Sequence, residues 1–240
     1  MVSPDRRAFV EAKAIRFDHK LGDSQLDPFE LANTLGLQVV ALPLGNDSPV
    51  EGVYLRRAGR GFILVNSSKA YRRQRFTCAH EIGHHVLLGE GDEFDLVEGP
   101  DQINGQGDPE EREAFLFASE LLMPEIGIRP LVQAIATVED KVAAVVRAYD
   151  TSPQSAAIRL SELSILTDAE TKSFIAAIKN TAQWKAFVTS QGIHSNDGGR
   201  QGQMRLPATF RHLAKTLFDA GVLAPERYKE LVQRDLPGAQ

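Results

Sequence analysis

Residues 75–88 contain the pattern His-Glu-x-x-His, in which His80 and His84 stand four residues apart. Residues four apart on an α-helix differ by only about 40° in direction and lie one turn apart. If the stretch is helical, both imidazoles project from one face and can bind the same metal ion, as neutral imidazoles commonly bind Zn²⁺. Glu81 points about 100° away from His80, so its carboxylate can reach a nearby water without ligating the metal. The pattern predicts a metal site with Glu81 as general base.

Apolar residues indicate a helix over the same stretch. They recur at steps of three and four residues, the spacing of one buried helix face: Phe76, Ala79, Ile82, Gly83, Val86 and Leu87. We expect Ser67 or Ser68 to cap its start and Gly89 to end it. Gly83 costs about 1 kcal/mol relative to alanine inside a helix, so we expect a backbone or the substrate to approach closely there. The alternative is a core helix whose histidines only fill space.

A second helix is predicted over residues 108–124. Asp108 suits the N-cap, Pro109 the first helical position and Pro124 the end. Its glutamates are candidates for a third metal ligand: Glu110, Glu111 and Glu113. The spacing from Asp108 to Glu111 also fits a capping box, in which Glu111 would only satisfy the helix N-terminus. The residues alone leave both interpretations open.

Together these segments resemble the ImmA/IrrE family of metallopeptidases. The matching parts are the strand-like residues 61–66, the His80–His84 helix, and the pattern Glu111-x-x-Ala114-x-x-Phe117-Ala118-x-x-Leu121-Leu122-Met123-Pro124, within about residues 27–166. The resemblance implies a zincin-like fold of the gluzincin type, with His80, His84 and Glu111 as metal ligands and Glu81 as general base. Phe115 stands where the family usually has Asn, so any bracing of a ligand must come from another residue.

The resemblance also implies a function. We expect a metal-dependent endopeptidase, with Zn²⁺ as cofactor and Mn²⁺ as the alternative. Its expected substrate is a specific DNA-binding transcriptional repressor, whose cleavage relieves repression of stress-response or mobile-element genes. The alternative is a non-proteolytic regulator or toxin–antitoxin component that uses the same fold to bind a protein partner or DNA. Four residues are candidates for stabilising the oxyanion: Tyr54, Tyr71, Tyr149 and His85.

Composition and charge fit a protein of the cytoplasm. No run of about 20 apolar residues predicts a membrane span, and the first residues lack the apolar core of a secretory signal. The single cysteine, Cys78, fits a reducing compartment, and we expect it to be a small buried residue. The net charge of −5 argues against general nucleic-acid binding.

We expect an α+β fold with two parts. Helices are predicted over residues 5–20 and 28–35, and strands over 37–42, 51–56 and 62–66. This order suggests a small, mostly antiparallel three-stranded sheet packed on the active-site helix, followed by a mainly helical C-terminal region. We divide the chain into a zincin-like metallopeptidase domain, residues 1–167, and a helical region, residues 168–240, with a flexible loop at 191–206.

Further helices are predicted over residues 131–137, 138–149, 154–163, 168–190, 207–220 and 225–234. The pair within 138–163 has the short turn of a helix-turn-helix. Its second helix offers Gln154, Ser155 and Arg159 for contacts to bases. We interpret this pair as scaffold and do not expect direct DNA binding.

Charge is distributed unevenly around the active-site helix. Seven basic residues and no acidic ones lie between positions 56 and 75: Arg56, Arg57, Arg60, Lys69, Arg72, Arg73 and Arg75. They form either a footprint for DNA or an acidic protein, or a solvated flank. Residues 90–113 carry ten acidic residues against one basic. We predict a long, mobile loop there, which acts as a lid, recruits a basic substrate or is an ordinary acidic surface loop.

Overall fold

The computed structural model describes residues 4–57, 59–88, 94–98, 108–179, 181–193, 200–219, 221 and 224–233. In its first half the elements are α1 (Pro4–Asp18), α2 (Pro28–Thr34), β1 (Gln38–Leu42), β2 (Gly52–Arg57), β3 (Arg60–Asn66), α3 (Tyr71–Leu87), β4 (Phe94–Glu98) and α4 (Pro109–Leu122). The second half contains α5 (Glu125–Val132), α6 (Val138–Tyr149), α7 (Pro153–Glu162), α8 (Asp168–Lys179), α9 (Thr181–Ser190), α10 (Ala208–Asp219) and α11 (Pro225–Gln233). The α+β class is confirmed.

The sheet has four strands in the order β1-β3-β2-β4. β1 pairs with β3 in parallel, whereas β2 pairs antiparallel with both β3 and β4. The three predicted strands and the mostly antiparallel pairing are confirmed. The prediction of a continuous loop over 90–113 is wrong at Phe94–Glu98, because these residues form the edge strand β4. The remaining residues of that predicted loop before Asp108 lie outside the described residues.

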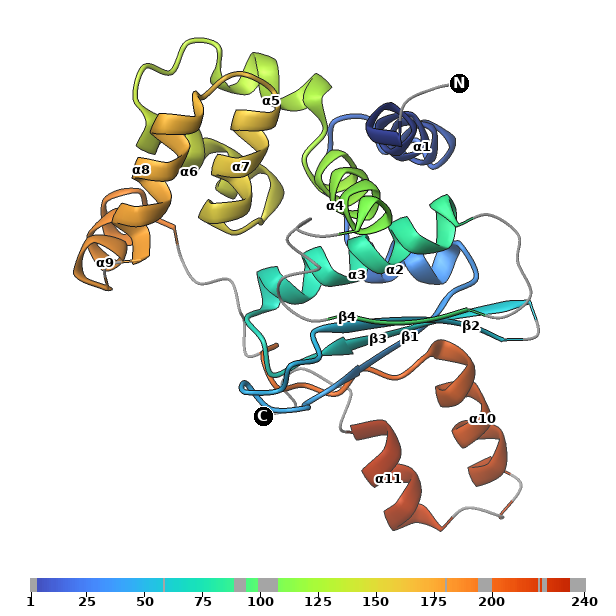
Figure 1. Ribbon diagram of the computed structural model, residues 1–240. Helices are drawn as coiled ribbons and strands as arrows, with labels where there is room; N and C mark the ends of the chain where they lie inside the picture. Colours follow the sequence, from blue (N-terminus) through green and yellow to red (C-terminus); the bar gives the residue numbers. More distant parts are fainter. Residues whose placement is uncertain are drawn as a thin grey trace.

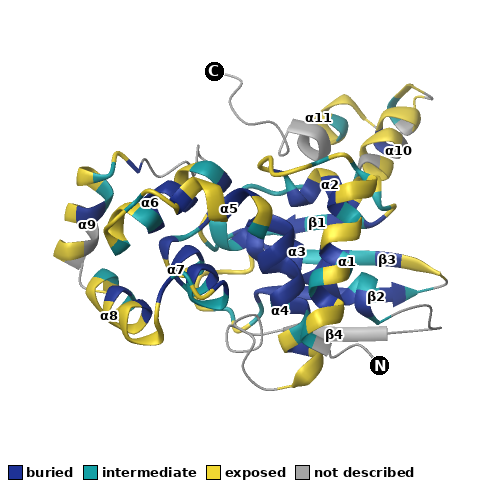
Figure 2. Ribbon diagram, turned by 90° about the horizontal axis from the view of Figure 1, so that it is seen from above, coloured by how far each residue is buried: buried dark blue, intermediate teal, exposed yellow. Residues whose placement is uncertain are grey.

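The helices of the first half stack on one face of the sheet. α3 packs on β2 and β3, α4 packs on α3, and α1 packs on α4. In Figure 1 these helices lie above the sheet, and α10 and α11 lie on its opposite side. Figure 2 shows that α3 and α4 form the most buried part of the molecule. A metal site between these two helices is therefore held inside the core.

The ends of the two central helices test the predicted caps. α3 begins at Tyr71 with Ala70 at the N-cap and without a side-chain cap bond, so the predicted serine caps are wrong. Ser68 instead accepts a hydrogen bond from the backbone N–H of Gly45 at 2.9 Å. Gly89, predicted to end α3, lies outside the described residues. At α4 the prediction is confirmed, because Asp108 accepts from the N–H of Glu110 at 3.0 Å.

Two helices of the second half differ from the prediction. The helix expected at 131–137 instead runs over Glu125–Val132, directly after Pro124. The single helix expected at 168–190 is a hairpin of α8 and α9, in which the Phe174 and Phe187 rings meet edge to face at 5.5 Å. Helical periodicity does not reveal a break between two consecutive helices.

The segment predicted as a flexible loop, residues 191–206, contacts β1 in its last part. Ala41 of β1 and Arg205 exchange two backbone hydrogen bonds, at 2.9 and 3.0 Å. The Arg205 guanidinium lies 4.1 Å from the ring centroid of Phe29, a favourable cation–π geometry. Residues 194–199 lie outside the described residues. The segment 200–206 therefore pairs with β1 at Ala41, on the edge of the sheet.

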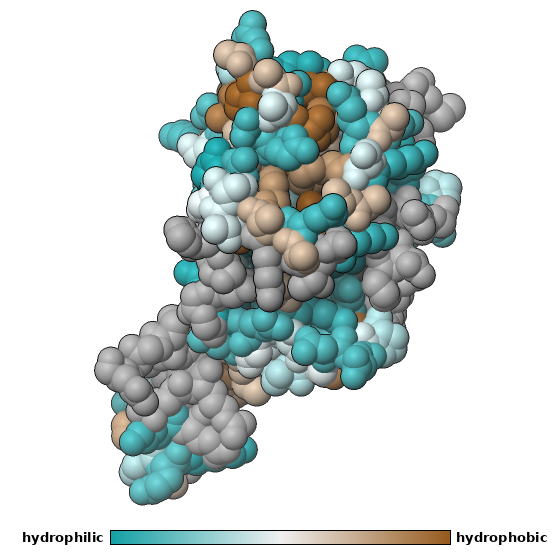
Figure 3. Space-filling model, turned by 90° about the vertical axis from the view of Figure 1, so that its left-hand side faces the viewer, coloured by the Kyte–Doolittle hydropathy of each residue, from teal (hydrophilic) through white to brown (hydrophobic). Residues whose placement is uncertain are grey.

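The helices α5, α6, α7, α8 and α9 form one end of the molecule (Figure 1). Apolar side chains gather in the upper part of the face that this end presents (Figure 3). Pro130, Val132 and Ile165 line a hollow in this region. Among the described residues, no helix combines the length and the apolar character needed to span a bilayer.

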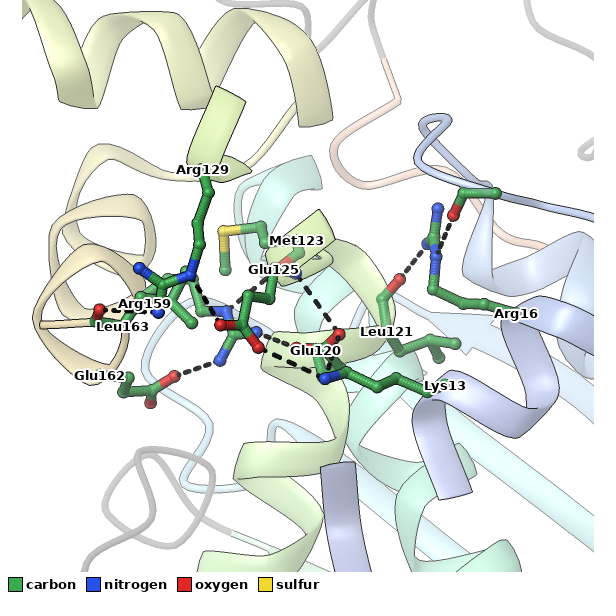
Figure 4. A network of polar contacts seen from close by, with 11 residues as sticks. Lys13, Arg16, Glu120, Leu121, Met123, Glu125, Arg129, Arg159, Glu162 and Leu163 are labelled. Atoms are coloured by element: carbon green, nitrogen blue, oxygen red, sulfur yellow. Dashed lines mark hydrogen bonds and ion pairs between the residues drawn. The ribbon is translucent and has the colours of Figure 1, made fainter. Parts of the chain in front are cut away.

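A buried arginine joins this helical end to α4 (Figure 4). Arg159 of α7 is fully buried, and its Nε donates to the carbonyl of Met123 at 3.0 Å. Its guanidinium also pairs with Glu120 and, at 3.0 Å, with Glu162. Burial raises the pKa of both carboxyls, and the arginine opposes that rise. A guanidinium used in this way does not reach bases, which supports the interpretation of α6 and α7 as scaffold.

Replacing Arg159 with alanine should destabilise the protein by about 3–5 kcal/mol, because Glu120 would keep a buried charge without its partner. The matched control is Arg129→Ala, which removes an exposed pair with Glu125 on α5 and a hydrogen bond to the carbonyl of Leu163, and should cost about 1 kcal/mol. Urea unfolding measures both values. Equal losses for the two variants would contradict a structural role for the buried arginine.

Candidate metal centre

Three buried side chains converge between α3 and α4. Nε2 of His80 lies 3.2 Å from Oε2 of Glu111 and 3.1 Å from Nε2 of His84. Nε2 of His84 lies 3.7 Å from the same carboxylate oxygen. The histidines come from successive turns of α3, and the glutamate comes from the first turn of α4. The structure thus brings together the three residues that were predicted as ligands from the sequence.

These donor atoms fit a divalent metal ion. Ligands about 2.0–2.1 Å from a tetrahedral metal lie about 3.3–3.4 Å from one another. The three observed separations of 3.1, 3.2 and 3.7 Å bracket that value. Two imidazole nitrogens and one carboxylate oxygen are also a donor set typical of catalytic zinc, which keeps a fourth position open. In the described part of the chain, His80, His84 and Glu111 form the group of side chains that could share an ion.

The orientation of Glu111 bears on the choice between the ligand and capping interpretations. Its carboxylate points to His80 and is 4% exposed. Asp108 caps the helix through the N–H of Glu110. Glu110 is exposed, Glu113 is half-buried, and neither belongs to the converging group. The geometry therefore favours Glu111 as the third ligand.

Gly83 explains how α3 and α4 come close enough for this convergence. A Cβ at this position would lie 3.1 Å from Cα of Ala114 and 3.2 Å from its carbonyl oxygen. It would also lie 3.1 Å from the ring of Phe117. The expected close approach is thus made by the backbone of α4. Because Gly83 lies between His80 and His84, the closest packing of the two helices coincides with the site.

Glu81 lies on the side of α3 that faces the sheet. It is fully buried, and its carboxylate lies against the backbone of Gly52 at the start of β2. Glu81 directly follows His80 in the chain, and its carboxylate faces β2. The sequence identified Glu81 through its motif but gave no sign of the contact with Gly52.

Two of the four oxyanion candidates, Tyr54 and His85, contact each other. The Tyr54 hydroxyl lies 2.8 Å from Nδ1 of His85 and accepts from Nε of Arg56 at 3.0 Å. Burial raises the pKa of Tyr54, and burial followed by the charge of Arg56 lowers the pKa of His85. Tyr71 begins α3, roughly 13 Å along the axis from His80. Tyr149 ends α6 and lies against Gly127. The structure brings neither Tyr71 nor Tyr149 to the three converging side chains.

Two further sequence features have structural explanations. Phe115, at the position of the family's usual Asn, packs its ring 5.4 Å from that of Phe76. It thus adds an apolar contact between α3 and α4. Cys78 is fully buried, as expected, and burial raises its pKa well above the ordinary value.

The basic residues around α3 are largely used inside the protein. Arg72 pairs with Asp150 at 2.9 Å, and Arg73 pairs with Glu51. Arg75 donates to the carbonyl of Leu26 at 2.8 Å. Lys69 and Arg56 likewise donate to backbone carbonyls. These contacts favour a structural role for the cluster over a footprint for DNA.

Gly83→Ala should weaken metal binding roughly tenfold, because the added methyl group pushes α3 and α4 apart by a few tenths of an ångström. It should also destabilise the fold, although alanine gains about 1 kcal/mol in helix propensity. Competition with a chromophoric chelator measures the metal affinity, and urea unfolding measures the stability. A more stable variant with unchanged metal affinity would show that close packing at Gly83 is not needed.

Comparison with known proteins agrees with this arrangement. Residues 32–161, more than half of the chain, match the peptidase family described as the IrrE N-terminal-like domain. The chain is 33% identical over 158 residues to the radiation response metalloprotease IrrE of Deinococcus radiodurans, covering 65% of this chain and 43% of that protein. It is 33% identical over 129 residues to the protein of the same name from Deinococcus deserti, covering 53% of this chain and 43% of the relative. The chain spans less than half the length of these curated relatives. The resemblance seen in the sequence is confirmed, and the chain belongs to the family of peptidases with an IrrE N-terminal-like domain.

Proposed function

We propose that this protein is a metal-dependent endopeptidase. His80, His84 and Glu111 bind the metal ion, and Glu81 is the general base. The observation that carries the proposal is the convergence of two imidazoles and one carboxylate, at separations of 3.1–3.7 Å, in a member of a peptidase family. Zn²⁺ is the proposed metal because the donor set suits it, and Mn²⁺ is the alternative.

The three proposed ligands and Glu81 have different roles in the proposed reaction. A metal ion held by the three ligands would polarise a peptide carbonyl and acidify a water molecule. Glu81, on the side of α3 towards β2, accepts the proton from that water and passes it to the leaving amine. Burial of the ligands and of Glu81 keeps bulk water away, which strengthens electrostatic interactions in the site.

We propose that an extended segment of the substrate adds to the outer edge of β4, which pairs with no further strand among the described residues. Gly52, which contacts Glu81, pairs with Glu98 at the end of β4. The outer edge of β4 thus lies one strand away from the proposed base. The opposite edge, β1, already pairs with Arg205. Strand addition supplies backbone hydrogen bonds that hold a peptide in line with the site.

The proposed substrate is a DNA-binding transcriptional repressor of the cytoplasm, whose cleavage relieves repression of stress-response or mobile-element genes. The names of the two Deinococcus relatives, radiation response metalloproteases, support a stress-related role. We assign the peptidase activity to residues 1–167, which include the family match, and leave 168–240 as a helical region that supports it.

Glu81→Gln should retain the metal and lose cleavage by about 10²–10⁴-fold, because the amide cannot accept the proton. The test incubates purified protein with the purified repressor encoded by the adjacent gene, with and without chelator, and identifies fragments by mass spectrometry. Glu110→Gln, at an exposed site in α4, is the control and should cleave normally. Undiminished cleavage by Glu81→Gln would remove Glu81 from this role, and regulation that persists without cleavage would favour a binding function.

Glu111→Ala should abolish stoichiometric metal binding, because it removes one of three protein ligands. Glu110→Ala changes the neighbouring exposed residue and should leave the metal content unchanged. Elemental analysis after dialysis against a metal buffer reports both results. If Glu111 served only as a capping residue, its variant would keep the metal and lose only about 1 kcal/mol of stability.

A further inference from the structure

Gly52 lies where a side chain would collide with the proposed base. A Cβ at this position would overlap Oε1 of Glu81, and would lie 3.0 Å from Cδ of Glu81 and 2.6 Å from Cγ2 of Thr77. Both Glu81 and Thr77 are buried on α3, with exposures of 0% and 1%. Neither side chain therefore has open solvent into which it could withdraw.

The backbone of Gly52 does not itself require glycine. Its φ angle lies outside the left-handed region, unlike those of Gly36 and Gly59. It pairs regularly with Val65 of β3 and Glu98 of β4 in the interior of the sheet. Gly52 is the first residue of β2, and a glycine in a strand often marks the close approach of another group. The approaching group here is the Glu81 carboxylate.

Contacts on both sides of Gly52 fix β2 against α3. Glu51 pairs with Arg73, and the Tyr54 hydroxyl lies 2.8 Å from His85. Two residues of a strand advance about 6.7 Å, and four residues of a helix advance about 6.0 Å. These two spacings are similar, and position 52 lies against Glu81. The contacts of Glu51 and Tyr54 oppose sliding of β2 along α3.

We propose that Gly52 is a positioning residue for the general base. Its missing side chain makes a shallow seat on β2 in which the Glu81 carboxylate is held in one orientation beside the metal ligands. This inference rests on the function proposed above, since it assigns Gly52 a part in the same site. A side chain at position 52 would turn the carboxylate by an ångström or more, and a misplacement of about 1 Å can cost roughly 100-fold in rate.

The experiment compares Gly52→Ala in two backgrounds. One is the natural sequence, and the other carries Glu81→Ala and Thr77→Ser, which remove the atoms that the new methyl group would meet. Urea midpoints and metal stoichiometry are measured for each protein, and kcat and KM on the repressor are measured for Gly52→Ala in the natural background. The strand control is Gly61→Ala on β3, whose methyl group would collide with the end of the Leu37 side chain instead of Glu81. It would lie 3.4 Å from His85 and Tyr54, which is an ordinary van der Waals contact.

We expect Gly52→Ala to lower the urea midpoint in the natural background. In the background that carries Glu81→Ala and Thr77→Ser, it should change the midpoint little. It should keep one metal ion per chain and lower kcat about 100-fold with little change in KM. Gly61→Ala should lower the midpoint and keep kcat. If Gly52→Ala does not fold by itself but folds together with Glu81→Ala and Thr77→Ser, the collision is established.

An equal fall in the urea midpoint in both backgrounds would overturn the inference. An unchanged kcat for Gly52→Ala would also overturn it, and a raised KM beside the unchanged kcat would indicate a contact with substrate. Failure of Gly52→Ala to fold in both backgrounds would likewise assign it to the fold alone. A metal-loaded natural protein that does not cleave the repressor would refute the proposed function instead, and the urea midpoints would still decide whether Gly52 seats Glu81.

Discussion

The close packing of α3 on α4 is the constraint on which the site depends. The two histidines share a face of α3 because of their spacing, but the third donor comes from another helix. Its oxygen reaches 3.2 Å from His80 only because Gly83 lets the backbone of Ala114 approach. A glycine that weakens the helix locally thus permits the contact between helices that assembles the site.

Side chains of α1, α7 and β2 contact these two helices. Arg16 of α1 donates to the carbonyl of Leu121 at the end of α4. Arg159 of α7 binds the carbonyl of Met123 and the carboxylate of Glu120. On the other side, β2 holds α3 through Arg56 and Tyr54, which contact His85. These arginines are hydrogen-bonded where the elements meet, so shifting one helix would break several of these contacts.

The sequence predicted the features that depend on local spacing. The His80–His84 pattern, the Asp108 cap and the first three strands follow from short-range periodicity and capping rules. β4 was missed because Phe94–Glu98 lies within an acidic, glycine-rich stretch, and its pairing with β2 is a long-range contact. The seat at Gly52 was missed for the same reason, since its neighbour Glu81 is distant in the chain. Glu111 needed the family resemblance, because its spacing also fitted a helix cap.

The most direct test of this account is anomalous X-ray diffraction from crystals grown with Zn²⁺, recorded on both sides of the zinc absorption edge. The account predicts one strong peak within about 2.0–2.2 Å of Nε2 of His80, Nε2 of His84 and a carboxylate oxygen of Glu111. A fully loaded crystal with its zinc peak elsewhere, and with Glu111 turned away from the histidines, would contradict it.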